Sequence, residues 1–135
     1  MKIHPYLNFD GQCAEAFSFY ARVLGGSVRV MSVDESPMGA DLGPEWQGRT
    51  IHAHLDLGDQ VLLGSDSPPG QHRQPQGVWV SVQVRTSEET ERIFNALADG
   101  GTPVMALQET FWSKRFGMLV DRFGTPWMLN CDPNA

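Results

Sequence analysis

Three of the four histidines are the residues of this 135-residue chain best suited to acid–base or metal chemistry. His52 and His54 lie in a stretch that alternates polar and apolar side chains, which predicts a β-strand over residues 50–57. Side chains two positions apart on a strand point to the same face, so the two imidazoles should lie side by side. With His4 or Asp56 they could form a facial triad around iron, zinc or manganese. The alternative is that both form hydrogen bonds on the outer or pocket face of the strand.

A second group of residues could bind a small molecule through apolar contacts. Its members are large aromatic side chains in the C-terminal half: Trp79, Phe111, Trp112, Phe116 and Trp127. Aromatic clefts bind flat or apolar molecules with few polar anchors. We expect Trp127 in the core, whereas Trp112 lies in a polar loop and predicts a pocket wall or a dimer contact. Lys114 and Arg115 could hold an anionic substrate group or remain solvated on the surface.

Other chemistry has little support in the sequence. Cys13 begins a predicted helix, where the helix dipole could lower its thiol pKa. The alternative is that Cys13 is a small buried residue. The sequence contains no glycine-rich phosphate loop, no strand-linked Gly-x-Gly-x-x-Gly and no Gly-x-Ser-x-Gly elbow. It therefore gives no indication of a nucleotide site or a methyl-donor site.

The elements that must position these residues occur twice along the chain. Apolar spacing and turn signals predict, in the first half, a strand over 3–9, a helix over 12–24, a strand over 27–32 and a hairpin over 50–57 and 60–65. In the second half they predict a strand over 78–84, a helix after a capping box at 86–89, a strand over 103–107 and a hairpin over 116–120 and 126–131. Both halves are therefore strand–helix–strand–hairpin units.

A repeated glycine pair supports this internal repeat. Gly25-Gly26-Ser27 matches Gly100-Gly101-Thr102 at an offset of 75 residues. Neither half could close its sheet alone, so we expect one domain over 1–135, with repeats 1–66 and 77–135 joined by a linker over 67–76. The long Pro/Gly-rich segment 34–49 is either a lid over a pocket or a mobile excursion.

The last fifth of the chain also carries a family resemblance. Phe111-Trp112, Gly117, Asp121, Phe123-Gly124 and Trp127 together resemble the closing signature of PhnB-like proteins. These belong to the vicinal-oxygen-chelate superfamily, with glyoxalases, extradiol dioxygenases and bleomycin- and fosfomycin-resistance proteins, and are often labelled 3-demethylubiquinone-9 3-methyltransferase-like. The resemblance implies an α+β fold in which two βαβββ modules form a curved mixed sheet around a cleft. It also implies a homodimer.

The resemblance further implies where a metal would bind. Superfamily members that hold a divalent ion take one ligand from the first and one from the last strand of each half. His4 matches the first position, but the repeat offset places Trp79 at the second, and the last-strand positions fall at Met128 and within 62–64. Only His4 could ligate a divalent ion, so the resemblance implies a degenerate metal site. The residues expected to line the pocket are His4, His52, His54, Trp79, Phe111, Trp112 and Phe116.

Two functions follow as expectations. The first is a small-molecule-binding protein with an aromatic cleft and no cofactor. The second is a metal-dependent lyase, isomerase or dioxygenase that uses His4 with His52 and His54 and holds a divalent metal.

Composition restricts the partners. The formal net charge of −6 argues against nucleic acid or an anionic membrane surface, because both attract basic patches. No apolar run approaches the length of a membrane span, and the first residues lack the features of a signal peptide. The two cysteines need no disulfide, and we expect a cytoplasmic protein with free thiols.

Overall fold

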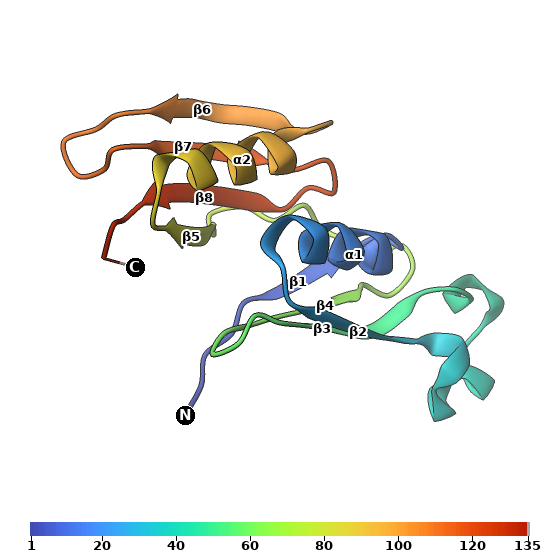
Figure 1. The fold of residues 1–135 in the computed structure, drawn as a ribbon. Helices are drawn as coiled ribbons and strands as arrows, with labels where there is room; N and C mark the ends of the chain where they lie inside the picture. The colour runs from blue at the N-terminus through green and yellow to red at the C-terminus, as the bar shows by residue number, and fades with distance from the viewer. Residues whose placement is uncertain (135) are drawn as a thin grey trace. The chain divides into compact units, whose positions relative to one another are not determined.

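The computed structural model describes residues 1–134, which divide into two compact units. The first unit, module 1, spans Met1–Arg73, and the second unit, module 2, begins at Gln74. Each unit is built from one helix and one four-stranded mixed sheet (Figure 1). Within the described residues, no helix is long and apolar enough to cross a membrane.

Module 1 is a βαβββ unit. Its elements are β1 (Tyr6–Phe9), α1 (Cys13–Leu24), β2 (Ser27–Ser32), β3 (Thr50–Asp56) and β4 (Val61–Asp66). The strand order is β1-β4-β3-β2, with β1 parallel to β4 and the other pairs antiparallel. The segment between β2 and β3 contains three short 3₁₀ turns, η1 (Val33–Glu35), η2 (Pro37–Ala40) and η3 (Pro44–Trp46).

Module 2 repeats this topology. Its elements are β5 (Val80–Val84), α2 (Ser87–Ala98), β6 (Thr102–Gln108), β7 (Phe116–Val120) and β8 (Pro126–Cys131). The strand order is β5-β8-β7-β6, with β5 parallel to β8. The fold is therefore the predicted pair of βαβββ modules, each with its own four-stranded sheet.

The helix of each module covers one face of the sheet. Ala53 and Leu55 of β3 are fully buried, whereas the intervening His54 is only half-buried and His52 is exposed. Close packing of the helix requires glycine on the strand beneath it. A Cβ at Gly64 would lie 2.6 Å from the Phe17 ring of α1, and a Cβ at Gly117 would lie 2.8 Å from the ring of Phe94 in α2. A large side chain of the helix therefore packs directly over a glycine of the strand, and this close packing fixes the position of each helix on its sheet.

The repeated glycine pairs have a shared structural cause. The second glycine of each pair packs against the backbone at the end of a neighbouring strand. A Cβ at Gly26 would lie 2.2 Å from the carbonyl oxygen of Asp56, and one at Gly101 would lie 2.4 Å from that of Val120. No other residue fits this approach without moving the chain.

Several predicted boundaries needed correction. β1 begins at Tyr6 rather than residue 3, because the preceding residues include Pro5, which has no backbone N–H for a sheet ladder. β5 begins at Val80 rather than residue 78, and β4 extends to Asp66.

The capping prediction at α2 is confirmed for Thr86, whose hydroxyl accepts a hydrogen bond from the Glu89 N–H at 3.2 Å. The β7 and β8 boundaries agree with the predicted hairpin.

Candidate functional site

Each sheet has a second face, opposite its own helix, which we call the helix-free face. The predicted functional residues can be assigned to these faces from the strand registers. In module 1, His54 pairs with Leu63 of β4 and with Arg29 of β2, while Leu63 also pairs with Tyr6. Directly paired residues point to the same face, so these four side chains form one row across the sheet.

The helix-free face of module 1 is mostly polar. His52 is exposed, pairs with Met31, and has its ring centroid 6.3 Å from that of Tyr6. The hydroxyl of Ser65 donates to the side-chain oxygen of Asn8 at 3.4 Å. The face therefore presents imidazole, guanidinium, phenol, amide and hydroxyl groups on neighbouring strands.

His54 has an unusual environment on this face. Its Nδ1 is buried and has no hydrogen-bond partner among residues 1–134. The imidazole of His54 therefore has unused hydrogen-bonding capacity.

The histidines do not assemble into a metal centre. Among residues 1–134, no group of three or more His, Cys, Asp or Glu side chains could hold a metal ion. His52 and His54 share a face as predicted, whereas His4 precedes β1 and is half-buried. Asp56, the other candidate for a triad, accepts a hydrogen bond from the Gly58 N–H at 2.9 Å in the β3–β4 turn.

The structure also locates the four ligand positions implied by the family resemblance. The register pairs Tyr6 with Leu63 and the corresponding Ser81 with Met128. Leu63 and Met128 are therefore equivalent positions of the two last strands, and both fall within the last-strand positions that the resemblance implies. Leucine and tryptophan offer no metal ligand, and a thioether suits soft ions rather than hard divalent ones. These side chains do not fit the divalent ion of the superfamily.

The helix-free face of module 2 carries a row of apolar side chains. Met118 of β7 pairs with Met105 of β6 on one side and with Met128 of β8 on the other, which places three thioethers in one row. Phe116 lies in the next row of the same face, opposite Asn130. The side-chain amide of Asn130 donates to Gln83 at 2.7 Å, so this polar pair borders the apolar surface.

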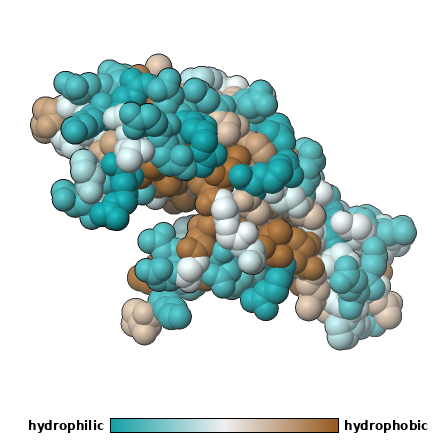
Figure 2. Space-filling model, in the orientation of Figure 1, coloured by the Kyte–Doolittle hydropathy of each residue, from teal (hydrophilic) through white to brown (hydrophobic). Residues whose placement is uncertain are grey.

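Two aromatic residues extend this apolar surface beyond the sheet. The Trp112 ring meets the Phe116 ring edge-to-face at 5.4 Å, and the Phe111 ring meets Trp112 at 4.8 Å. Phe111 is 98% exposed and Trp112 is 56% exposed. Figure 2 shows that hydrophobic side chains reach the surface among hydrophilic ones. We call the set Met105, Phe111, Trp112, Phe116, Met118 and Met128 the Met–aromatic surface.

Hydrogen bonds of Ser113 anchor the loop that carries Phe111 and Trp112. Ser113 is 7% exposed, and its hydroxyl donates to the carbonyl of Arg115 at 2.9 Å. The Thr110 N–H donates to the carbonyl of Ser113 at 2.9 Å, and the Cys131 N–H donates to that of Arg115 at 2.8 Å. The exposed aromatic rings therefore sit on an anchored loop. No local pattern in the sequence indicated this role for Ser113.

The remaining predicted residues have mixed positions. Trp127 is 1% exposed, which confirms its assignment to the core, and its Nε1 donates to Asp121 at 2.9 Å. Trp79 is half-buried just before β5. Arg115 lies 3.7 Å from Glu91 of α2, and Lys114 is exposed.

Cys13 is a buried structural residue. Its thiol is inaccessible to solvent, and burial together with the nearby Asp66 carboxylate raises its pKa strongly. The helix dipole therefore does not produce the reactive thiolate that was one of the two alternatives.

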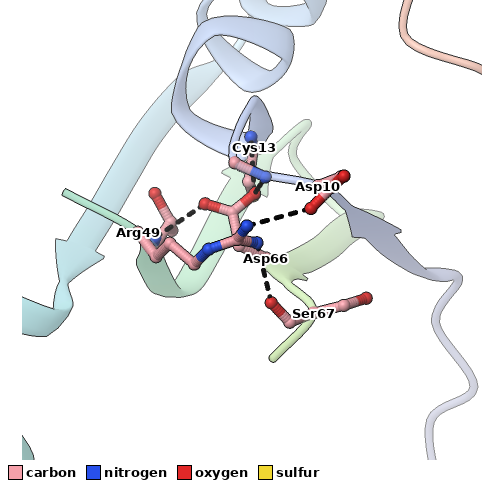
Figure 3. A network of polar contacts seen from close by, with 7 residues as sticks. Asp10, Cys13, Arg49, Asp66 and Ser67 are labelled. Atoms are coloured by element: carbon pink, nitrogen blue, oxygen red, sulfur yellow. Dashed lines mark hydrogen bonds and ion pairs between the residues drawn. The ribbon is translucent and has the colours of Figure 1, made fainter. Parts of the chain in front are cut away.

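Asp66 organises this end of α1 (Figure 3). Its Oδ1 accepts from the N–H groups of Gly11 and Cys13 at 2.8 and 3.0 Å, and its Oδ2 accepts from the Thr50 N–H at 2.8 Å. Arg49 lies beside it and donates to the Ser67 carbonyl and the Asp10 carboxylate, each at 2.9 Å. This long-range network was not predicted, because nothing local in the sequence marks a carboxylate that caps a helix 53 positions away.

The comparisons with known proteins agree with this architecture. A family profile described as "3-demethylubiquinone-9 3-methyltransferase" matches residues 1–130. Protein YjdN of Escherichia coli is 34% identical, over 96% of this chain and 95% of its own length. The crystal structure of protein PA1353 from Pseudomonas aeruginosa is 42% identical, with a TM-score of 0.89 over 98% of both chains. A putative 3-demethylubiquinone-9 3-methyltransferase, PhnB protein, from Bacillus cereus is 29% identical, with a TM-score of 0.79 over 98% of this chain and 100% of its own.

More distant structures match at the level of the fold. A glyoxalase/bleomycin resistance protein/dioxygenase family enzyme from Burkholderia phytofirmans has a TM-score of 0.60 at 18% identity, over 93% and 95% of the two chains. A variant of the fosfomycin resistance protein FosX from Listeria monocytogenes, solved with Mn(II), has a TM-score of 0.65 at 10% identity, over 98% and 92%. These matches place both modules in the glyoxalase/bleomycin-resistance fold.

Proposed function

We propose that this chain, which belongs to the 3-demethylubiquinone-9 3-methyltransferase-like (PhnB) family, binds a flat, apolar small molecule on the Met–aromatic surface of module 2 without a metal. The observation that carries the proposal is the exposure of Phe111 and Trp112 on an anchored loop beside a row of three methionines.

The chemistry of this surface suits an aromatic or polarisable ligand. Thioethers are flexible and make favourable contacts with ring edges, so a methionine row can adapt to ligands of different outline. In an edge-to-face pair, the ring that contributes its edge keeps both of its faces clear of the other ring, so a flat ligand can stack on it. Asn130 and Gln83 at the border of the surface supply polar groups that would orient a ligand.

The residues give no support to chemistry through a divalent ion at the four superfamily positions. Those positions hold His4, Leu63, Trp79 and Met128, and only the imidazole is an ordinary ligand for such an ion. Methyl transfer has no support either, because the chain lacks a glycine-rich strand-to-helix loop for a methyl donor.

The most direct test uses a neutral fluorescent probe of the proposed chemistry. N-phenylnaphthylamine should bind the purified protein and gain fluorescence, in the presence of a chelator as in its absence. Replacement of Trp112 by Ala should weaken the binding of the probe at least tenfold, which corresponds to a loss of about 1.4 kcal/mol of binding free energy. Met38→Ala is the matched control, because Met38 is 52% exposed and lies in η2, outside the Met–aromatic surface. Equal affinities of the two variants would refute the proposal.

The second candidate is a metal-dependent lyase, isomerase or dioxygenase using His4, His52 and His54. The shared face of His52 and His54 is the observation in its favour. Elemental analysis of untagged protein, in wild type and His52→Ala, distinguishes the two functions. Near-stoichiometric metal that disappears in the variant would support the enzyme. Absence of metal after incubation with iron, zinc, nickel and manganese would support the binding protein.

The exposed aromatic residues are also suited to a homodimer contact, as the family resemblance implies. Sedimentation of wild type and Trp112→Ala tests this independently of ligand binding. A dimer that dissociates in Trp112→Ala and not in Met38→Ala would assign the Met–aromatic surface to self-association.

A further inference from the structure

We infer that the helix-free face of module 1 contains a binding site for a small oxyanion group, a carboxylate or a phosphoryl group, formed by Arg29, His52 and His54. The inference does not depend on the proposed function, because it concerns a different module and a different kind of ligand.

The first step is the spacing of the three side chains. Arg29 and His54 pair directly across β2 and β3, and directly paired residues have Cβ atoms about 5 Å apart. His52 follows two positions from His54 on the same face, about 7 Å along the strand. Arg29, His52 and His54 therefore occupy neighbouring positions on one face, with Cβ spacings that allow a guanidinium and two imidazoles to reach the oxygens of a single anionic group.

The second step is the charge around this point. Within the described residues, Arg29 makes no ion pair, unlike Arg49, Arg92 and Arg115. Asp56, the acidic residue of β3, lies on the same face in the next row, and it accepts a hydrogen bond from the Gly58 N–H in the β3–β4 turn. A cation without a carboxylate partner on a chain of formal charge −6 is a local site for an anion.

The third step is the hydrogen-bonding capacity of His54. The Nδ1 of His54 is buried and has no hydrogen-bond partner among the described residues, so Nε2 is the ring nitrogen that we assign to the ligand. An Nε2–H group there can donate to an oxyanion held by the Arg29 guanidinium, which itself offers two parallel N–H donors. The imidazole of His52 lies on the other side, next to the Tyr6 ring.

The test follows the imidazole nitrogens of the ¹⁵N-labelled protein by NMR while inorganic phosphate or acetate is added at constant pH and ionic strength. Saturable shifts at His52 and His54 are expected, while His72, in the segment after β4, should not move. Arg29→Gln should weaken the apparent affinity at least tenfold. Arg85→Gln, which removes an exposed arginine outside this face, should stay within twofold of wild type.

Two further variants distinguish the loss of a ligand contact from misfolding of the protein. Arg29→Lys keeps the charge and should retain weakened binding, while His54→Gln keeps an N–H donor near the Nε2 position and should bind better than His54→Ala. Equal shifts with chloride at the same ionic strength would overturn the inference. So would equal movement of His72, or an affinity of Arg29→Gln within twofold of wild type.

Discussion

Replacement of Asp121 by Asn should reveal how the C-terminal hairpin is held together. Asp121 is 3% exposed, and its Oδ1 accepts hydrogen bonds from the N–H groups of Phe123 and Thr125 at 2.8 and 3.0 Å. Its Oδ2 accepts from Nε1 of Trp127 at 2.9 Å. The carboxylate therefore joins the turn to the largest buried side chain of module 2.

The expected cost follows from these contacts. Asparagine has the same shape and can keep one oxygen toward the turn, but its NH₂ group would then face the indole N–H of Trp127. The charge-assisted hydrogen bond to the buried indole N–H is lost, which costs about 3 kcal/mol of unfolding free energy. This is a large share of the 5–15 kcal/mol typical of a domain, yet it should leave the protein folded.

Urea unfolding followed by far-UV circular dichroism measures this cost, and a double-mutant cycle isolates its cause. Trp127→Phe removes the indole N–H, so Asp121→Asn should cost about 1–2 kcal/mol less in that background than in wild type. If the two substitutions are additive within about 0.5 kcal/mol, the hydrogen bond between Asp121 and Trp127 does not account for the stability of the hairpin.

Three other predictions concern single positions. Burial raises the Cys13 pKa in the folded state, so the stability contributed by the protonated thiol should be lost as pH rises above about 8.5, the ordinary thiol value. Urea titrations from pH 7 to 10 should show a smaller decline for Cys13→Ala than for wild type, and equal slopes would contradict this. Gly101→Ala should lower the unfolding free energy by more than 2 kcal/mol, because the new Cβ would meet the Val120 carbonyl. Gly48→Ala places its Cβ in open space and should cost only about 1 kcal/mol, from the positive φ alone. Thermal melts compare the two variants. Ser113→Ala should weaken N-phenylnaphthylamine binding several-fold by loosening the aromatic loop, and an unchanged affinity would show that the loop needs no such anchor.

Much of the fold could be predicted because the relevant signals are local. Apolar alternation located the strands, and the glycine pairs at an offset of 75 residues revealed the repeat. Both second glycines occupy the same structural position, against a strand-end carbonyl. The β1 boundary was wrong because hydrophobicity alone does not show where a proline interrupts the ladder.

The candidate site was harder to predict, because its residues are brought together by pairing between strands that are distant in the sequence. The sequence placed His52 and His54 on one face, but it could not show that Arg29 is the cross-strand partner of His54. Likewise, the row formed by Met105, Met118 and Met128 depends on the registers of three strands. No spacing along the chain reveals such a row.

The residues that carried the family resemblance are largely structural. Asp121 fixes the turn and Trp127, Gly124 adopts φ 93°, and Gly117 allows the close approach of α2. These residues identify the fold because the fold needs them. Only Phe111 and Trp112 of the signature are exposed, and they are the ones we assign to ligand binding.

The most direct test of the metal-free binding account is an NMR titration of metal-stripped protein labelled with ¹³C at the methionine methyl groups. The six methionines report separately on the chain. With N-phenylnaphthylamine, we predict saturable shifts of Met105, Met118 and Met128, whereas Met31 of module 1, Met38 and Met1 remain unchanged. Shifts confined to Met31, or no shifts until a divalent metal is restored, would contradict the account.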